Sequence, residues 1–257
     1  MFASALLLLA LFLATWWLAC RWNNFSIVDV TWALAFAPVA FWHAFAGTGW
    51  LPRRLAVGTL VAAWSLRLGL HLWWRVAHHH PAEDPRYAVL RARWQGREAR
   101  AFLGFFLAQG VLVWLLMLPV ALLAAESRPA FHPLEWAGLA LWLTGLAGEA
   151  LADAQLTRFK RRPNAGLGVC DEGLWSWSRH PNYFFQSLLW WGLFLMALPS
   201  PLGWTSVVAP LAMLHFLLNV TGIPLTEKLS LERRGEAYRA YQRRTSPFLP
   251  RPPHRDP

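Results

Sequence analysis

A polar cluster able to bind an anion runs directly into an apolar stretch within residues 173–192. Arg179 and His180 can each bind a phosphate or a carboxylate, and the proline that follows them suits the first turn of a helix. On that helix Asn182 and Gln186 lie four residues apart and therefore share one face, where they do nothing for membrane insertion. We interpret this stretch as the rim of a cofactor site. The alternative is a helix cap with an arginine that extends to the membrane surface.

Two acidic residues close the apolar segment that precedes this stretch. Glu149 and Asp153 are one helical turn apart, and anions at the C-terminal end of a helix oppose its dipole. A ligand hydroxyl or amide, or the cations of residues 158–162, would compensate for this arrangement. We expect a ligand role for Asp153, whereas Glu149 can simply pair with an arginine.

An earlier apolar segment carries four polar or aromatic side chains on one helical stripe. They are spaced by three, four and four residues: Trp64, Arg67, His71 and Arg75. Polar groups inside a membrane are costly unless they are paired or line a cavity, so the stripe is expected to face the protein interior. Arg67 needs a partner there, and Asp29 is a candidate. Asp29 can alternatively be an anion that stabilises the start of its own helix, while Arg75 can extend to the surface.

We expect no metal site. Three consecutive histidines, residues 78–80, cannot all face one ion from a helix. Cys20 and Cys170 do not have the spacing of metal ligands, and neither requires an oxidising compartment.

Composition places these groups in an integral membrane protein. The chain has 257 residues, of which 56% are hydrophobic and only 15% are charged, and its apolar runs approach the roughly 20 residues that a bilayer span requires. We expect an all-α fold, a bundle of seven transmembrane helices with cytoplasmic loops and a C-terminal tail. The expected spans are residues 2–19, 27–46, 55–77, 102–124, 134–152, 183–198 and 204–220. Because no repeat or linker divides them, residues 1–257 form one expected domain, with the cofactor-binding part mainly at 149–250.

The distribution of basic residues predicts the orientation in the membrane. With the N-terminus outside, most of the 24 Lys and Arg residues fall in cytoplasmic segments, as the positive-inside rule requires. The C-terminal tail is then cytoplasmic and is expected to be helical through about Arg244. The net charge of +10 does not indicate nucleic acid, because the cations are spread between apolar runs. Membrane lipid and phosphate-bearing ligands are the expected partners.

Several short motifs along the chain resemble one known family. They are Glu83-Asp-Pro-Arg-Tyr87, Arg158-Phe-Lys160, Gly173-Leu-Trp, Arg179-His-Pro-Asn-Tyr-Phe, Trp190-Trp-Gly and Gly222-Ile-Pro-Leu-Thr-Glu-Lys228. Together these motifs are similar to those of the bacterial branch of the steroid 5α-reductase family, the DUF1295 group, over nearly the whole chain. The resemblance implies seven transmembrane helices, a bacterial inner-membrane location and NADPH as the cofactor. It also implies reduction of the 4,5 double bond of a 3-oxo-Δ4-steroid or a similar lipophilic enone.

The same resemblance assigns expected cofactor contacts. Asn182 and Asp153 match polar cofactor contacts of the reductases, and Lys160 falls where an arginine binds the nucleotide. Gln186 replaces the usual glutamate, so it can hydrogen-bond an amide but supplies no negative charge. The full expected cofactor-binding set is Arg86, Tyr87, Asp153, Lys160, Arg179, His180, Asn182, Tyr183, Gln186, Glu227 and Lys228.

Two residues are the expected catalytic groups. Asp29 falls near the substrate-binding glutamate of the family, and Trp64 falls near the tyrosine that partners it. A protonated carboxylic acid in a dry cavity can hydrogen-bond the carbonyl oxygen of an enone as that oxygen gains negative charge, and Asp29 is expected to do so. Trp64 is expected to hold the flat substrate and to donate through its indole nitrogen.

Two other classes of function remain open. The Arg-His-Pro element and the tail motif Tyr238-x-x-Tyr241 are also similar to those of isoprenylcysteine and phospholipid methyltransferases, which use S-adenosylmethionine. A non-catalytic lipid-binding or transport protein is the third class, although repeated halves and broken helices are not evident. The chain has neither a Rossmann fingerprint nor a P-loop, so any nucleotide must be held by cationic loops and helix ends. The nucleotide that copurifies would separate the first two classes.

Overall fold

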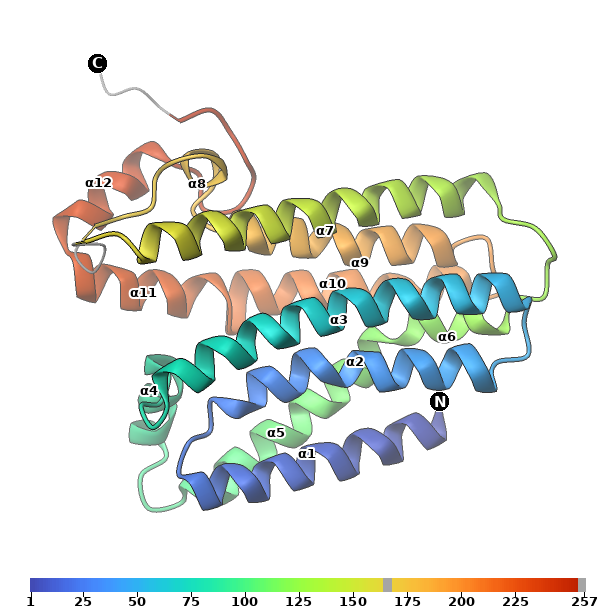
Figure 1. Cartoon of the computed structure of the whole chain (residues 1–257), viewed down its shortest axis with the longest axis horizontal. Helices are drawn as coiled ribbons and strands as arrows, with labels where there is room; N and C mark the ends of the chain where they lie inside the picture. Colours follow the sequence, from blue (N-terminus) through green and yellow to red (C-terminus); the bar gives the residue numbers. More distant parts are fainter. Residues whose placement is uncertain (164–167, 254–257) are drawn as a thin grey trace. The chain divides into compact units, whose positions relative to one another are not determined.

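The computed structural model describes residues 1–163 and 168–253, and within these ranges the regular structure is helical, without a β-sheet (Figure 1). The chain divides into two compact units. The first comprises Met1–His132 with Ala197–Ala209, and the second comprises Pro133–Met196 with Pro210–Pro257. The all-α expectation is therefore confirmed, whereas the single domain over residues 1–257 stays a prediction.

The first unit is built around two helix pairs that pack side by side, α2 with α3 and α1 with α5. Its elements are α1 (Phe2–Trp22), α2 (Ile27–Ala46), α3 (Leu51–His79), α4 (Pro85–Arg93), α5 (Glu98–Leu116), α6 (Leu118–Ala125) and the 3-10 helix η1 (Gly203–Val207). The hydroxyl of Ser65 on α3 donates to the carbonyl oxygen of Ala33 at 2.6 Å and accepts from the N–H of Ala37 at 3.1 Å. These buried bonds fix the antiparallel register of α2 against α3.

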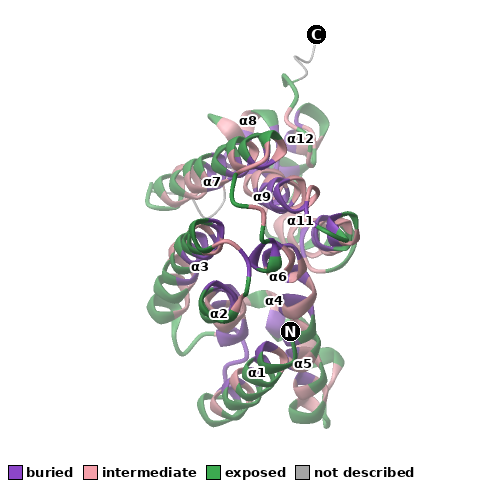
Figure 2. Cartoon of the chain, turned by 90° about the vertical axis from the view of Figure 1, so that its right-hand side faces the viewer, coloured by how far each residue is buried: buried purple, intermediate pink, exposed green. Residues whose placement is uncertain are grey.

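Buried residues of α1 recur every three or four positions, the period of one helical stripe: Ser4, Leu8, Phe12, Thr15 and Ala19. The opposite side exposes large apolar residues, among them Leu6, Leu13 and Trp17, and exposed residues cover one side of α1 in Figure 2. An apolar outer face of this kind suits contact with lipid.

The second unit contains a closely packed helix pair and the C-terminal helices. Its elements are α7 (Pro133–Lys160), α8 (Leu174–Trp177), α9 (Pro181–Ala197), α10 (Val208–His215, which starts in the first unit), the π-helical turn η2 (Phe216–Val220), α11 (Ile223–Arg234) and α12 (Glu236–Arg244). Gly138 and Gly192 let α7 and α9 approach, because a Cβ at Gly192 would lie 2.7 Å from the carbonyl oxygen of Gly138. The helical tail is confirmed, with a break at Gly235, whose φ is +52°.

Within the described residues, five helical segments are long and apolar enough to cross a membrane. They are Phe2–Trp22, Ile27–Ala46, Leu51–His79, Glu98–Ala125 and Gly203–Arg234. They include the expected first to fourth and seventh spans. The expected fifth and sixth spans are helical but are not among the five: α9 has 17 residues, fewer than the roughly 20 that a span requires, and α7 carries three acidic residues. The structure therefore has the character of a membrane protein, and the expected count of seven spans stays a prediction.

Candidate functional site

Asp29 is the centre of a polar cluster in the first unit, where α2 begins. Its Oδ1 accepts a hydrogen bond of 2.6 Å from the hydroxyl of Tyr87. Its Oδ2 accepts one of 2.6 Å from Arg86 and one of 3.3 Å from Arg75. Asp29 thus accepts from three donors, which is the behaviour of a carboxylate.

The Glu83-Asp-Pro-Arg-Tyr87 motif brings two of these donors to Asp29. Asp84 caps the start of α4 by accepting from the N–H of Arg86 at 3.0 Å, and a proline at the first helical position suits this geometry. The N–H of Asp84 donates to the hydroxyl of Ser26 at 2.8 Å, and the Glu83 carboxylate accepts from the N–H of Phe25 at 2.7 Å. The motif is therefore fastened to the turn from which α2 starts, beside Asp29.

Tyr87 remains protonated over the ordinary pH range. Its side chain is buried, and this burial together with the negative charge of Asp29 raises the pKa of the phenol well above its usual range. Burial acts to lower the pKa of Arg86, but the charge of Asp29 and the hydrogen bonds with Asp84 raise it well above its usual range. Tyr87 is thus a hydrogen-bond donor beside a permanent cation.

Two predictions about this cluster need correction, whereas the expected catalytic role of Asp29 stays a prediction. The partner of Asp29 from the α3 stripe is Arg75 and not Arg67. Arg75 does not simply extend to the surface, because it also lies 3.6 Å from a carboxylate oxygen of Asp84.

Trp64, the other expected catalytic residue, lies among aromatic rings. Its side chain is buried, and its ring meets that of Phe36 edge-on with centroids 5.2 Å apart. Phe36 in turn meets the ring of Trp32 at 5.0 Å. Trp64 therefore packs within an aromatic cluster, and its expected roles in holding the substrate and donating through its indole nitrogen stay predictions.

Glu227 on α11 is the centre of a second polar cluster, in the second unit. Its carboxylate accepts from Arg179 through Nε at 2.8 Å and Nη2 at 3.0 Å, and it lies 2.9 Å from Nε2 of His180. Tyr238 donates to it at 2.9 Å and Gln242 at 2.6 Å. Two segments far apart in the sequence thus converge on one largely buried carboxylate.

This cluster fastens the Arg-His-Pro element to the C-terminal tail. The remaining guanidinium nitrogen of Arg179 donates to the carbonyl oxygen of Gln242 at 3.1 Å and to that of Thr245 at 2.5 Å. The backbone N–H of Arg179 donates to the carbonyl oxygen of Ser246 at 2.8 Å. Burial and the nearby Glu227 charge raise the pKa of Tyr238 well above its usual range, so its hydroxyl stays a donor. Arg179, His180 and Glu227 therefore bind one another in this structure, and contacts of theirs with a cofactor stay predictions.

The first turns of α9 hold three further expected cofactor residues. The side-chain oxygen Oδ1 of Asn182 is buried and accepts no hydrogen bond within the described part of the chain. Gln186 is buried on the same face one turn later, and the ring of Tyr183 stacks on that of His180 with centroids 5.4 Å apart. A buried acceptor without a donor costs about 1–3 kcal/mol. A ligand with an N–H or O–H group would satisfy it.

Three other expected cofactor residues are Lys228, Asp153 and Lys160. Lys228 is exposed, and its ammonium group lies 3.9 Å from Glu232 rather than in the Glu227 cluster. Asp153 is half-buried on α7, and Lys160 is the exposed last residue of that helix. No cluster that could hold a metal ion occurs within residues 1–163 and 168–253.

Sequence reasoning missed several members of both clusters. Asp84 and Ser26 were not singled out, although Asp84 lies inside the motif that carries Arg86 and Tyr87. Gln242 was also missed. Tyr238 and Tyr241 were expected to pack or to lie at the membrane interface, and their spacing places both on one helical face, where both are buried.

Comparisons with known proteins match most of the chain, including the segments that carry both polar clusters. The chain is 30% identical to the uncharacterized protein C594.04c of Schizosaccharomyces pombe over 264 residues, which cover 92% of this chain and 75% of the yeast protein. No solved structure matches the chain. The family described as "Protein of unknown function (DUF1295)" matches residues 15–245, so both polar clusters fall within it. This protein is therefore a member of the DUF1295 family.

Proposed function

We propose that the protein is a membrane-embedded, NADPH-dependent reductase that transfers hydride to the 4,5 double bond of a 3-oxo-Δ4-steroid or a similar lipophilic enone. The observation that carries this proposal is the buried, unpartnered Oδ1 of Asn182 beside the Arg179-His180 element. It suits the carboxamide N–H of a nicotinamide or a ribose hydroxyl. The motif resemblance supplies the reaction class.

On this proposal, the residues around Asn182 bind and orient the cofactor. Asn182 accepts a hydrogen bond from it, and Gln186 can add a second amide contact from the same helical face. The Glu227 cluster keeps the first turn of α9 in place by binding Arg179 and His180. Lys160 is the expected partner for a phosphate group. When bound, NADPH supplies the hydride for the β-carbon of the enone.

The protein's part in the proton step falls to the Asp29 cluster. The carbonyl oxygen of the enone becomes more negative as the β-carbon accepts hydride, and a nearby hydroxyl stabilises it. Tyr87 is the donor available, because its phenol is protonated. When its O–H turns from Asp29 to the substrate, Arg75 and Arg86 still pair with the Asp29 carboxylate. The buried face of Trp64 suits a flat apolar substrate.

The proposal includes a membrane topology. α7 and α9 complete a seven-helix bundle with the five apolar segments, the N-terminus lies outside, and the C-terminal tail is cytoplasmic. The basic loops and tail then meet the soluble cofactor on the cytoplasmic side.

Binding of two cofactors to the full-length protein in detergent tests the proposal. NADPH should bind and S-adenosylmethionine should not, and a 3-oxo-Δ4-steroid should be reduced at the expense of NADPH. Asn182→Ala should weaken NADPH binding by about 1–3 kcal/mol without lowering the unfolding temperature. Asn219→Ala is the matched control, because Asn219 is exposed and should leave the affinity unchanged.

Two results would overturn this proposal. Binding of S-adenosylmethionine in place of NADPH would favour the methyltransferase class. Unchanged NADPH affinity in Asn182→Ala, with lost thermal stability, would mean that the Arg-His-Pro-Asn element is only a helix cap.

A further inference from the structure

Four exposed arginines lie at one end of the first unit, where α1 and α4 end and α5 begins (Figure 1). They are Arg21, Arg93, Arg97 and Arg100. Within the described residues, none of these side chains makes a hydrogen bond or an ion pair, whereas the neighbouring Arg91 is bound by Glu83 at 3.0 Å. The end of this unit therefore carries positive charge that the protein itself does not neutralise.

Side-chain hydrogen bonds hold these helix ends together. The indole N–H of Trp16 on α1 donates to the carbonyl oxygen of Ala99 on α5 at 2.8 Å. Arg91 on α4 donates to the side-chain oxygen of Asn23, just after α1, at 2.9 Å. The cations consequently belong to one surface rather than to three separate helix ends.

This surface lies where lipid headgroups are expected. Phe2–Trp22 ends here and Glu98–Ala125 starts here, and both segments are long and apolar enough to cross a membrane. Tryptophan is enriched at membrane–water interfaces, and the last two turns of α1 contain Trp16, Trp17 and Trp22. The exposed Leu13 and Trp17 continue as an apolar flank along α1.

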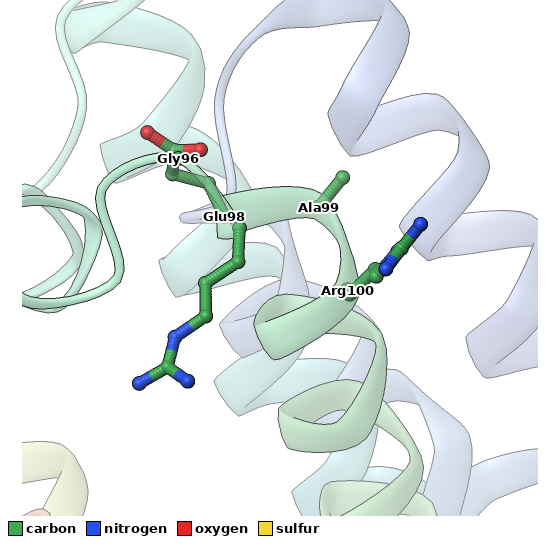
Figure 3. A pocket seen from close by; sticks show the side chains of 5 residues that line it. Gly96, Glu98, Ala99 and Arg100 are labelled. Carbon is green, nitrogen blue, oxygen red and sulfur yellow. The ribbon is translucent and has the colours of Figure 1, made fainter.

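A hollow of about 300 Å³ opens at the start of α5. It is lined by Gly96, Arg97, Glu98, Ala99 and Arg100, and Figure 3 shows the carboxylate of Glu98 and the guanidinium of Arg100 on different sides of this corner. The negative charge of Glu98 acts on Arg91, where it adds to the larger effect of Glu83 in raising the pKa of that guanidinium. Among the described residues, Glu98 forms no ion pair with Arg97 or Arg100.

We infer that this corner binds the phosphate-bearing headgroup of an anionic phospholipid, with Arg97 and Arg100 as the principal contacts. Guanidinium groups bind phosphate oxygens in bidentate fashion. The apolar flank of α1 provides a surface for the acyl chains, which a soluble phosphate could not use. The site lies outside the Asp29 and Glu227 clusters and is independent of the proposed reductase activity.

Titration of phosphatidylglycerol into the full-length protein in detergent, followed by native mass spectrometry, tests the site. Each basic residue near an anionic lipid surface contributes on the order of a fivefold change in affinity, so Arg97→Gln with Arg100→Gln should weaken the tightest phosphatidylglycerol binding about 25-fold. Glu98→Gln should strengthen it. Arg233→Gln with Arg243→Gln removes the same charge from exposed positions on α11 and α12 and should leave this binding unchanged. A gain in Glu98→Gln cannot result from misfolding.

Three outcomes would overturn the inference. Equal binding of phosphatidylcholine would show that headgroup charge is not recognised. Displacement of phosphatidylglycerol by millimolar inorganic phosphate would identify a soluble anion site instead. An equal loss in both double variants would mean that net charge, and not this corner, determines lipid binding.

Discussion

The hydroxyl of Tyr87 donates a hydrogen bond of 2.6 Å to Oδ1 of Asp29, across 58 positions of sequence. Asp29 also accepts hydrogen bonds from Arg86 and Arg75, and on the proposed function the Tyr87 phenol is the donor to the substrate carbonyl.

Tyr87→Phe should lower the rate of enone reduction by about 10² to 10⁴, because it removes the donor that stabilises the developing oxyanion. NADPH affinity should not change, since Tyr87 belongs to the Asp29 cluster. Single-turnover rates and cofactor titration of the same preparation measure both quantities. Full activity in this variant would remove Tyr87 from the proton step and leave the Trp64 indole as the candidate donor.

A double-mutant cycle should identify the ionic partners of Asp29. Asp29→Asn combined with Arg86→Gln should show a coupling energy of about 0.5–3 kcal/mol, because the two side chains are in contact. Asp29→Asn combined with Arg67→Gln should be additive to within about 0.5 kcal/mol, since Asp29 does not pair with Arg67. Unfolding free energies in detergent measure both cycles. Strong coupling to Arg67 would contradict the arrangement described above.

Asp84 should make the first unit sensitive to acid. Burial acts to raise the pKa of its carboxyl, but the hydrogen bonds and charge of Arg86, with the charge of Arg75, outweigh burial and lower it. A lowered pKa gives stability that is present above the unfolded value of about 3.9 and is lost as the pH falls through the folded value. The unfolding temperature of the wild type should therefore decrease as the pH is lowered below about 4. The unfolding temperature of Asp84→Asn should decrease less steeply over the same range.

Sequence patterns predicted the helices better than their contacts. The expected span at residues 27–46 coincides with α2 (Ile27–Ala46), because the apolar run of the sequence has the same bounds and Gly47 follows it. Periodicity also identified the stripe that contains Arg67 and Arg75. It shows which face of α3 these residues share, but not which of them lies beside the start of the neighbouring helix α2. The register of the α2–α3 hairpin decides this: the hydroxyl of Ser65 bonds to the backbone of Ala33 and Ala37, so the start of α2 lies beside the last turns of α3. An antiparallel register applied to the sequence would have favoured Arg75.

The Glu227 cluster was predictable only in part. Motif resemblance brought together Arg179, His180 and Glu227, but as separate cofactor contacts. Their mutual hydrogen bonds depend on where α11 and α12 fold back, and Gly235 with its positive φ determines this path. Short-range sequence patterns do not predict that α11 and α12 fold back onto the Arg179 segment.

Glu227→Gln should destabilise the packing of the C-terminal tail more than that of the membrane helices. The glutamine is isosteric but places an N–H₂ group among the donors of Arg179, His180, Tyr238 and Gln242, so hydrogen bonds to a largely buried group are lost at about 1–3 kcal/mol. Limited proteolysis should then cut near α12 faster than in the wild type. Lys228→Gln is the matched control, because Lys228 is exposed and bonds only to Glu232 at 3.9 Å. Equal proteolysis of the wild type and Glu227→Gln would show that this carboxylate does not fasten the tail.

Gly192 should tolerate no side chain, because α7 and α9 pack backbone against backbone at this point. A Cβ there would lie 2.7 Å from the carbonyl oxygen of Gly138 and 2.9 Å from the backbone nitrogen of Trp142, neither of which can move without shifting α7. Overpacking of this kind typically costs about 1–3 kcal/mol, so Gly192→Ala should lower the unfolding temperature. Gly104→Ala on α5 is the control, since nothing lies within 4 Å of the added Cβ and the change should be neutral or slightly stabilising. If both variants unfold at the wild-type temperature, α7 and α9 do not depend on this close approach.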